Sequence, residues 1–99
     1  MLSLFQVLQK LIEAGANVNE ANAHKQSPLH LAAQNAHAEI TRMLVQAGAD
    51  LDFKDLIGNT PLHTAFHNSH TGIAKLLVAS GANENARNLA GLTPFQLSG

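Results

Sequence analysis

Short strings of residues recur along this chain at a constant spacing of 33 positions. The string Ser-Pro-Leu-His returns as Thr-Pro-Leu-His and then as Thr-Pro-Phe-Gln, in residues 27–30, 60–63 and 93–96. A second string, Gly-Ala followed by Asn or Asp, occupies residues 15–17, 48–50 and 81–83. Such a period indicates one small unit built several times, whose apolar faces are buried when neighbouring units stack. The sequence therefore predicts a repeat architecture.

Each unit carries the signals of two helices and a turn. Thr60-Pro61 suits the start of a helix, because the hydroxyl accepts a backbone N–H and the missing N–H of proline costs nothing there. This first helix is expected to end near residue 68, and a second helix is expected over about residues 71–80. Gly81 then stands where a left-handed cap is common. The polar segment 83–92 predicts an extended stretch and a tight turn.

The period and the two strings together resemble the ankyrin repeat, and the resemblance covers essentially the whole chain. It implies an all-α solenoid of stacked helix-turn-helix units with projecting β-turn or hairpin fingers. It also implies a concave face lined by the fingers and the first helices. We expect a single ankyrin-repeat domain over residues 1–99. Its parts are a partial repeat, two complete repeats and a second partial repeat, in residues 1–23, 24–56, 57–89 and 90–99.

The partial repeats raise a question of stability, since about three complete repeats are usually needed for a stable stack. The chain is therefore either a piece of a longer array or a protein that associates with itself through open repeat ends. Lys10 stands where the other units have Met43 and Leu76, so we expect this side chain to face solvent. The C-terminal end carries no comparable polar replacement and is expected to be open, at Leu92, Phe95 and Leu97.

Composition and charge argue against several other classes of protein. A formal net charge of -1 gives no electrostatic reason to expect nucleic acid or an anionic membrane as partner. Without cysteine, the chain has no thiolate zinc ligand, no disulfide and no cysteine nucleophile. The N-terminal segment lacks the basic start of a signal peptide, and its apolar residues follow the spacing of an amphipathic helix. We expect an intracellular protein, cytoplasmic or nuclear.

Three of the six histidines, His63, His67 and His70, have the spacing to meet on one face of a helix, as metal ligands can. However, His63 recurs as His30 and His70 recurs as His37, which indicates a role in the scaffold. The ankyrin resemblance implies that the first histidine of each unit bonds within its own turn and helix. It implies that the later one bonds to backbone between neighbouring loops. We expect no metal site, and a histidine-based site is the less favoured alternative.

Catalysis finds no support in the residue pattern. Glycine-rich phosphate loops are absent, the acidic residues are scattered, and the serines stand at cap, loop or terminal positions. We therefore expect no catalytic residue, no cofactor and no enzyme. The expected function is that of a non-catalytic protein–protein interaction module. The alternative is a purely architectural segment or spacer of a longer ankyrin-repeat protein.

In ankyrin repeats the finger tips and the exposed face of the first helix vary in sequence and contact partners. The resemblance carries this role onto the matching positions of the three units. In chain order these are Ala23, His24, Gln26, Gln34 and Asn35, then Leu56, Ile57, Asn59, His67 and Asn68, then Leu89, Ala90 and Leu92. The expected partner is another protein of unknown identity.

The middle finger is unusual because it is apolar. Phe53, Leu56 and Ile57 place three large apolar side chains around a turn, where exposed loops prefer Asp, Asn, Gly or Lys. Exposed apolar groups with a polar rim mark protein interfaces, so these residues are candidates for a binding hot spot. In the alternative, Phe53 packs back onto the neighbouring repeat and Leu56 covers the stem of the hairpin.

Two departures from the family pattern concern the backbone. Ala36 and Ser69 stand where ankyrin repeats usually have glycine before the loop histidine, and a positive φ there costs about 1 kcal/mol at each residue. Lys25 stands where Gly58 and Gly91 occur in the other turns, so we expect a different turn type at Lys25.

Asn19 and Asn85 occupy the position that an intracellular asparaginyl hydroxylase modifies in ankyrin repeats. The resemblance therefore marks both residues as candidates for hydroxylation. Their simpler role is that of a loop amide that bonds to backbone.

Overall fold

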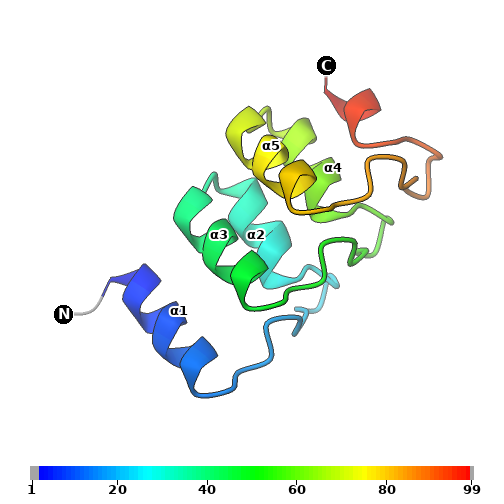
Figure 1. The fold of residues 1–99 in the computed structure, drawn as a ribbon. Coiled ribbons are helices and arrows are strands. Elements are labelled where there is room, and N and C mark those ends of the chain that lie inside the picture. The colour runs from blue at the N-terminus through cyan, green and yellow to red at the C-terminus, as the bar shows by residue number, and fades with distance from the viewer. Residues whose placement is uncertain (1–2, 99) are drawn as a thin grey trace.

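The computed structural model describes residues 3–98, and residues 1, 2 and 99 lie outside the described part. Figure 1 shows two antiparallel helix pairs side by side, with a single helix beyond one end of the row and a short helical turn beyond the other. The elements are α1 (Leu4–Glu13), α2 (Pro28–Gln34), α3 (Ala38–Gln46), α4 (Pro61–His67), α5 (Thr71–Ala79) and the 3-10 helix η1 (Phe95–Leu97).

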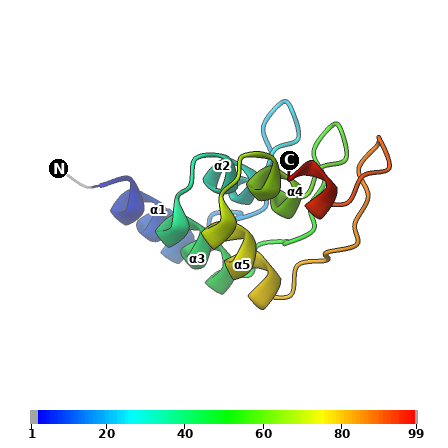
Figure 2. The same cartoon turned by 90° about the horizontal axis from the view of Figure 1, so that it is seen from above.

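Three loops project from the row of helices in the same direction (Figure 2). Residues 3–98 contain no β-strand, so the projections are turns and extended backbone. The predicted all-α solenoid of stacked helix pairs with projecting fingers is confirmed. The division into units at residues 23, 56 and 89 stays a prediction.

The first helix of each pair begins at the predicted capping signal. The hydroxyl oxygens of Ser27 and Thr60 accept the backbone N–H groups of His30 and His63, and proline follows at the first helical position. These caps satisfy N–H groups that have no partner inside the helix. The predicted helix start at Thr60-Pro61 is therefore confirmed, and the predicted second helix corresponds to α5.

Residues with positive φ separate the helices. Gly48 and Gly81 follow α3 and α5 with φ of 88° and 104°, as the cap pattern predicts. Ala36 and Ser69 follow α2 and α4 with φ of 58° and 60°. These two non-glycine residues therefore have the positive φ for which the sequence analysis gives a cost.

The turn at Lys25 has the same form as the turns that contain glycine. Its φ is 58°, against 81° at Gly58. The N–H of Lys25 donates to Asn22 O at 2.9 Å, and the N–H of Gly58 donates to Asp55 O at 3.0 Å. Our expectation of a different turn type at Lys25 is therefore wrong. The hydrogen bonds around Asn22 hold the turn, and Lys25 adopts the backbone conformation that they require.

The core runs as one apolar layer through the stack. Four leucines are almost completely buried at equivalent positions of two units: Leu29, Leu44, Leu62 and Leu77. Leu8 and Ile12 of α1 pack against this layer from one end, and Lys10 on the same helix is exposed as expected. Among the described helices, none combines the length and the apolar character that crossing a membrane requires.

Candidate functional site

Three fingers, defined as finger 1 (residues 22–26), finger 2 (residues 55–59) and finger 3 (residues 88–92), share one hydrogen-bond pattern. In each finger the N–H of the first residue donates to the carbonyl oxygen of the last, at 3.0 Å. In finger 2, Asp55 Oδ1 also accepts the N–H groups of Ile57 and Asn59, at 3.0 and 2.9 Å. Asn22 and Asn88 do the same in the other fingers. Each tip is therefore closed by bonds of its own backbone.

Neighbouring fingers are also bonded to one another. The N–H of Leu56 donates to His24 O at 3.2 Å, and the N–H of Leu89 donates to Ile57 O at 3.0 Å. Between the stems of fingers 2 and 3, Asn88 Nδ2 donates to Asn59 Oδ1 at 2.9 Å. These bonds join the three fingers into one ordered row.

Two buried histidines anchor the fingers to the helices. His30 Nε2 lies 2.7 Å from Asn59 O in finger 2, while the N–H of Ser27 donates to His30 Nδ1 at 3.1 Å. His63 makes the equivalent bonds to finger 3 and to its own cap, at 2.8 and 3.1 Å. Since Nδ1 accepts, Nε2 carries the proton and donates to the carbonyl. Burial lowers the pKa of both imidazoles, which favours this neutral form.

Of the three histidines in and beside α4, His63 and His70 bond to the scaffold and His67 does not take part in these bonds. Both ring nitrogens of His63 are used as described, and His70 Nε2 bonds to Gln34 O at 3.0 Å. The predicted bond from a later histidine to a neighbouring loop is confirmed at His70. His67 is exposed. In the part of the chain that the structure describes, no three His, Asp or Glu side chains come together as metal ligands. The arrangement does not support the alternative of a histidine-based metal site.

The finger tips expose large aliphatic side chains. Leu56 and Ile57 at the tip of finger 2 are 54% and 60% exposed, and Leu89 at the tip of finger 3 is 79% exposed. His24 and Ala90 are also exposed at the tips. A hollow of about 280 Å³ lies between fingers 1 and 2, lined by His24, Gln26, Asp55, Leu56 and Ile57. The tips of fingers 2 and 3 therefore present an apolar surface.

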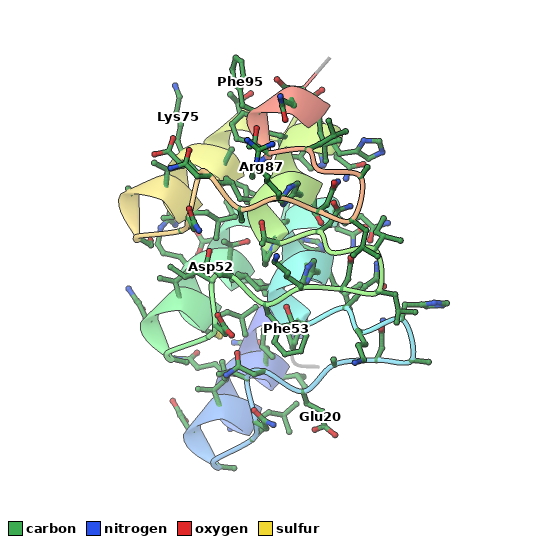
Figure 3. The ribbon with its side chains drawn as sticks, turned by 90° about the vertical axis from the view of Figure 1, so that its right-hand side faces the viewer. Glu20, Asp52, Phe53, Lys75, Arg87 and Phe95 are labelled. Carbon is green, nitrogen blue, oxygen red and sulfur yellow. The ribbon has the colours of Figure 1, made fainter. Side chains whose placement is uncertain are left out.

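Two residues of the expected binding surface, Phe53 and Asn59, are half-buried at the base of finger 2. Phe53 is half-buried, and its ring meets the His30 ring edge to face at a centroid distance of 6.3 Å (Figure 3). Phe53 thus packs back onto the scaffold, but its contact His30 lies in the same unit, residues 24–56, and not in a neighbouring one. Asn59 is also half-buried, and its carbonyl and side chain hold His30 and Asn88. The structure thus corrects the expectation that Phe53 and Asn59 form part of an exposed surface.

The polar positions of the first helices are exposed, as expected: Gln34, Asn35, His67 and Asn68. Two of them also cap their helices, because Asn35 Nδ2 donates to Leu31 O at 2.8 Å and Asn68 Nδ2 donates to Thr64 O at 2.9 Å. On finger 1, Gln26 is half-buried and accepts a bond from Asn22 Nδ2 at 3.1 Å. The polar surface beside the fingers is therefore partly engaged in holding the scaffold.

The two candidate hydroxylation sites differ in their surroundings. Asn19 Oδ1 accepts the N–H of Asp50 at 2.7 Å, which is the simpler role of a loop amide that bonds to backbone. Asp52 makes the same bond to Asn83 in the next unit, at 2.8 Å. Asn85 is exposed in its loop. The side chain of Asn19 thus joins consecutive loops.

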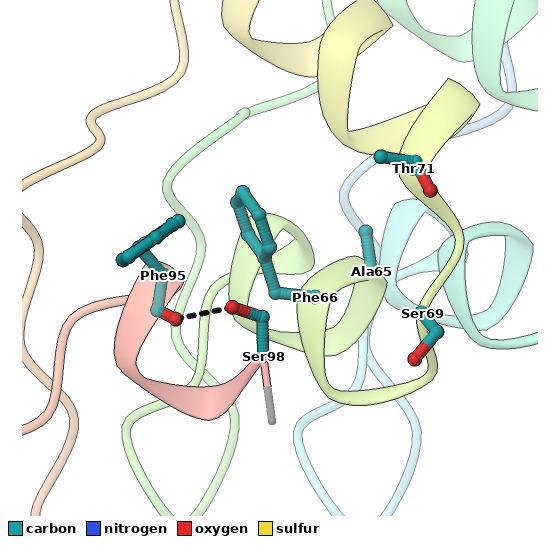
Figure 4. Close-up of a pocket in the computed structure, with 6 residues that line it drawn as sticks. All are labelled: Ala65, Phe66, Ser69, Thr71, Phe95 and Ser98. Atoms are coloured by element: carbon teal, nitrogen blue, oxygen red, sulfur yellow. Dashed lines mark hydrogen bonds between the residues drawn. The ribbon is translucent and has the colours of Figure 1, made fainter.

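A second apolar surface, of which the residue pattern indicated Phe95 but not Phe66, lies beside α5 and η1. Two adjoining hollows of about 300 and 420 Å³ share Phe66, Thr71 and Phe95 in their walls, and Figure 4 shows the first of them. The rings of Phe66 and Phe95 meet edge to face at a centroid distance of 6.0 Å, and Phe95 is 72% exposed. Phe66 stands 33 positions after Ala33, at the equivalent position of the next unit. This replacement of a small residue by a large aromatic one was the sequence signal that could have indicated the surface. Of the three residues expected at an open end, Phe95 is exposed, whereas Leu92 and Leu97 are half-buried.

Comparison with known proteins identifies the repeated unit. A family model described as ankyrin repeats (3 copies) matches residues 3–88. A search of curated proteins found no match. Ankyrin repeats are generally protein–protein interaction modules.

Proposed function

We propose that this chain, which belongs to the ankyrin repeat family, binds another protein through the tips of its fingers. The observation that carries the proposal is the exposure of Leu56, Ile57 and Leu89 on two adjacent, hydrogen-bonded fingers. Large exposed aliphatic groups gathered at one surface are the usual mark of a protein interface. The proposed role needs neither catalysis nor a cofactor, and its setting is intracellular.

Rigid display of the tips supports this role. Each tip is closed by hydrogen bonds within the finger, from backbone N–H groups to a backbone carbonyl and to the side chain of the first residue, so little conformational freedom is left to lose when a partner binds. We assign the centre of the interface to Leu56 and Ile57. The surrounding contacts are assigned to Ala23, His24, Gln26, Gln34, Asn35, His67, Asn68, Leu89 and Ala90. Truncation of a central hot-spot residue to alanine typically costs about 2 kcal/mol or more.

Affinity capture from cell lysate tests the proposal. The bait is the wild-type chain, compared with a Leu56→Asp/Ile57→Asp variant whose helical circular dichroism matches the wild type. A Val7→Asp/Leu11→Asp variant is the matched control, because these aliphatic residues of α1 are 39% and 52% exposed. We expect the same partner on wild type and control and its loss from the finger variant. Retention of that partner by the finger variant would place the interface elsewhere.

The apolar surface at Phe66 and Phe95 favours a second, architectural function. In that case the exposed ring of Phe95 is covered by another copy of the chain or by a neighbouring domain. Sedimentation at increasing concentration distinguishes the two functions. If the chain self-associates and the Phe95→Asp variant does not, the architectural function is supported. If the chain is a monomer at all concentrations, recognition of a partner by the fingers is the favoured function.

Hydroxylation of asparagine is a further part of the proposal. Asn85 is exposed, whereas Asn19 Oδ1 is held by the N–H of Asp50. We therefore expect Asn85 to be the better substrate of an asparaginyl hydroxylase. Mass spectrometry of tryptic peptides after treatment with such an enzyme measures the gain of one oxygen at each site. Modification of Asn19 alone would contradict this expectation.

A further inference from the structure

The two buried histidines each join a helix cap to a finger of the next unit. We infer that His30 and His63 act as acid-sensitive latches, which release fingers 2 and 3 separately from the helices when the solution becomes acidic. His30 holds finger 2 through Asn59 O, and His63 holds finger 3 through Leu92 O. Within residues 3–98, finger 1 receives no such bond from a histidine, so it supplies an internal reference.

The hydrogen bonds disfavour a second proton on either ring. Nε2 of His30 already donates to Asn59 O, and Nδ1 accepts the N–H of Ser27. A proton on Nδ1 would point toward that N–H, and only the Ser27 hydroxyl, 2.9 Å away, could accept it. The backbone N–H would then lose its acceptor in a buried site. The ring is therefore protonated readily only after it has left the site.

The charged neighbours do not reverse this preference. Burial is the largest cause at His30 and lowers its pKa, whereas the bond to Asn59 O and the Asp55 carboxylate raise it and the His63 ring lowers it. Burial is also the largest cause at His63, where the bond to Leu92 O and Asp55 raise the pKa and Lys54 lowers it. A released ring has the ordinary histidine pKa of 6.5. The closed finger is thus fully stabilised above pH 6.5 and loses stability as the pH falls below that value.

The third copy of the motif shows what can replace the histidine. Gln96 stands at the matching position, and its Oε1 accepts the N–H of Thr93 at 2.8 Å. Glutamine therefore makes the bond to the cap that Nδ1 makes in the other units, but it does not titrate between pH 5 and 8. His30→Gln and His63→Gln are consequently matched control variants.

The experiment measures amide hydrogen exchange at the N–H groups that close the fingers, at Asn22, Asp55 and Asn88. The quantity compared is the protection factor, which corrects for the pH dependence of intrinsic exchange. At pH 5.5, one unit below the pKa of a released histidine, opening of a finger is favoured by at most about tenfold. We expect a loss of protection of up to about tenfold at Asp55 and Asn88 between pH 7.5 and 5.5, and no loss at Asn22.

Each variant should act on one finger only. His30→Gln is expected to remove the pH-dependent loss at Asp55 and to leave it at Asn88, and His63→Gln is expected to do the reverse. Equal losses at all three amides would indicate global unfolding and overturn the proposal. So would protection at Asp55 and Asn88 that does not change with pH.

A titration of the wild-type chain alone keeps the proposal testable if a variant does not fold. The ring protons of His30 and His63, followed by NMR, should keep their neutral-form shifts while the fingers stay closed. Protonated rings with full finger protection would overturn the proposal. The inference extends the proposed function, because release of finger 2 displaces Leu56 and Ile57. The exchange measurement needs no binding partner, so it tests the latch independently of the proposed binding surface. Either proposal can therefore be overturned while the other is retained.

Discussion

At the scale of single residues, the backbone at Ala36 and Ser69 holds a conformation that glycine adopts more easily. Their φ values of 58° and 60° let the next residue fold back onto the preceding helix. The N–H of His37 donates to Ala32 O at 3.0 Å, and the N–H of His70 donates to Ala65 O at 2.9 Å. These bonds satisfy carbonyl groups at the ends of α2 and α4. The chain therefore tolerates local strain in order to close its helices.

Replacement by glycine should relieve that strain. We expect Ala36→Gly and Ser69→Gly each to stabilise the fold by about 1 kcal/mol, measured as a higher urea midpoint. Ala38→Gly is the control, since Ala38 is the first residue of α3 and glycine inside a helix destabilises by about 0.5–1 kcal/mol. Unchanged or lower midpoints at positions 36 and 69 would show that the positive φ carries no cost there.

At the scale of elements, the spacing of the fingers depends on a glycine that has no room for a side chain. A Cβ on Gly58 would lie 2.8 Å from the backbone N of Leu89 and 3.1 Å from the Cα of Asn88 in the next finger. Gly91 has a similar φ, 78° against 81°, but nothing lies within 4 Å of its Cβ position. The two glycines therefore separate the cost of backbone conformation from the cost of a contact between fingers.

We expect Gly58→Ala to destabilise the chain more than Gly91→Ala. Both variants bear the left-handed penalty of about 1–2 kcal/mol. Gly58→Ala also forces finger 3 away and breaks bonds such as Leu89 N–H to Ile57 O, adding about 1–3 kcal/mol. Urea unfolding of the two variants measures the difference. Equal losses of stability would mean that the fingers separate without cost.

The helices could be predicted from the sequence because their signals are local. Ser27, Thr60 and the prolines after them mark the helix starts, and the 33-residue period fixes the order of the stack. The places of Phe53 and Asn59 could not be predicted, because each depends on contact with a residue that lies far away in the sequence. The Asn59 carbonyl, for example, meets His30 across 29 positions of sequence. The angle at which units stack decides such contacts.

Lys25 shows a different limit of sequence reasoning. Residue preference predicts that a non-glycine residue changes the turn, yet its φ is 58°. The bonds from Asn22 Oδ1 to the N–H groups of His24 and Gln26, each 3.0 Å long, hold the same turn as in the other fingers. A network of several hydrogen bonds thus outweighs the preference of one residue.

At the scale of the whole molecule, the residues that stabilise the fold are different from the residues that we propose to contact a partner. The buried leucines, the histidine anchors and the bonds between fingers hold the scaffold, and the exposed aliphatic groups stand at its projecting tips. The molecule is elongated, with extents of 41 × 25 × 22 Å, and the finger row follows the stack (Figure 2). We therefore expect the tips to supply the binding energy and the remainder of the molecule to supply its stability.

The affinity of the partner captured by the wild-type chain tests this assignment most directly. Isothermal titration calorimetry would compare the wild type, a Leu56→Ala/Ile57→Ala variant and a Val7→Ala/Leu11→Ala control. We expect the finger variant to bind about thirtyfold more weakly or worse, which corresponds to about 2 kcal/mol, and the control to stay within about twofold. An unchanged affinity of the finger variant, or a comparable loss in the control, would contradict recognition by the finger tips.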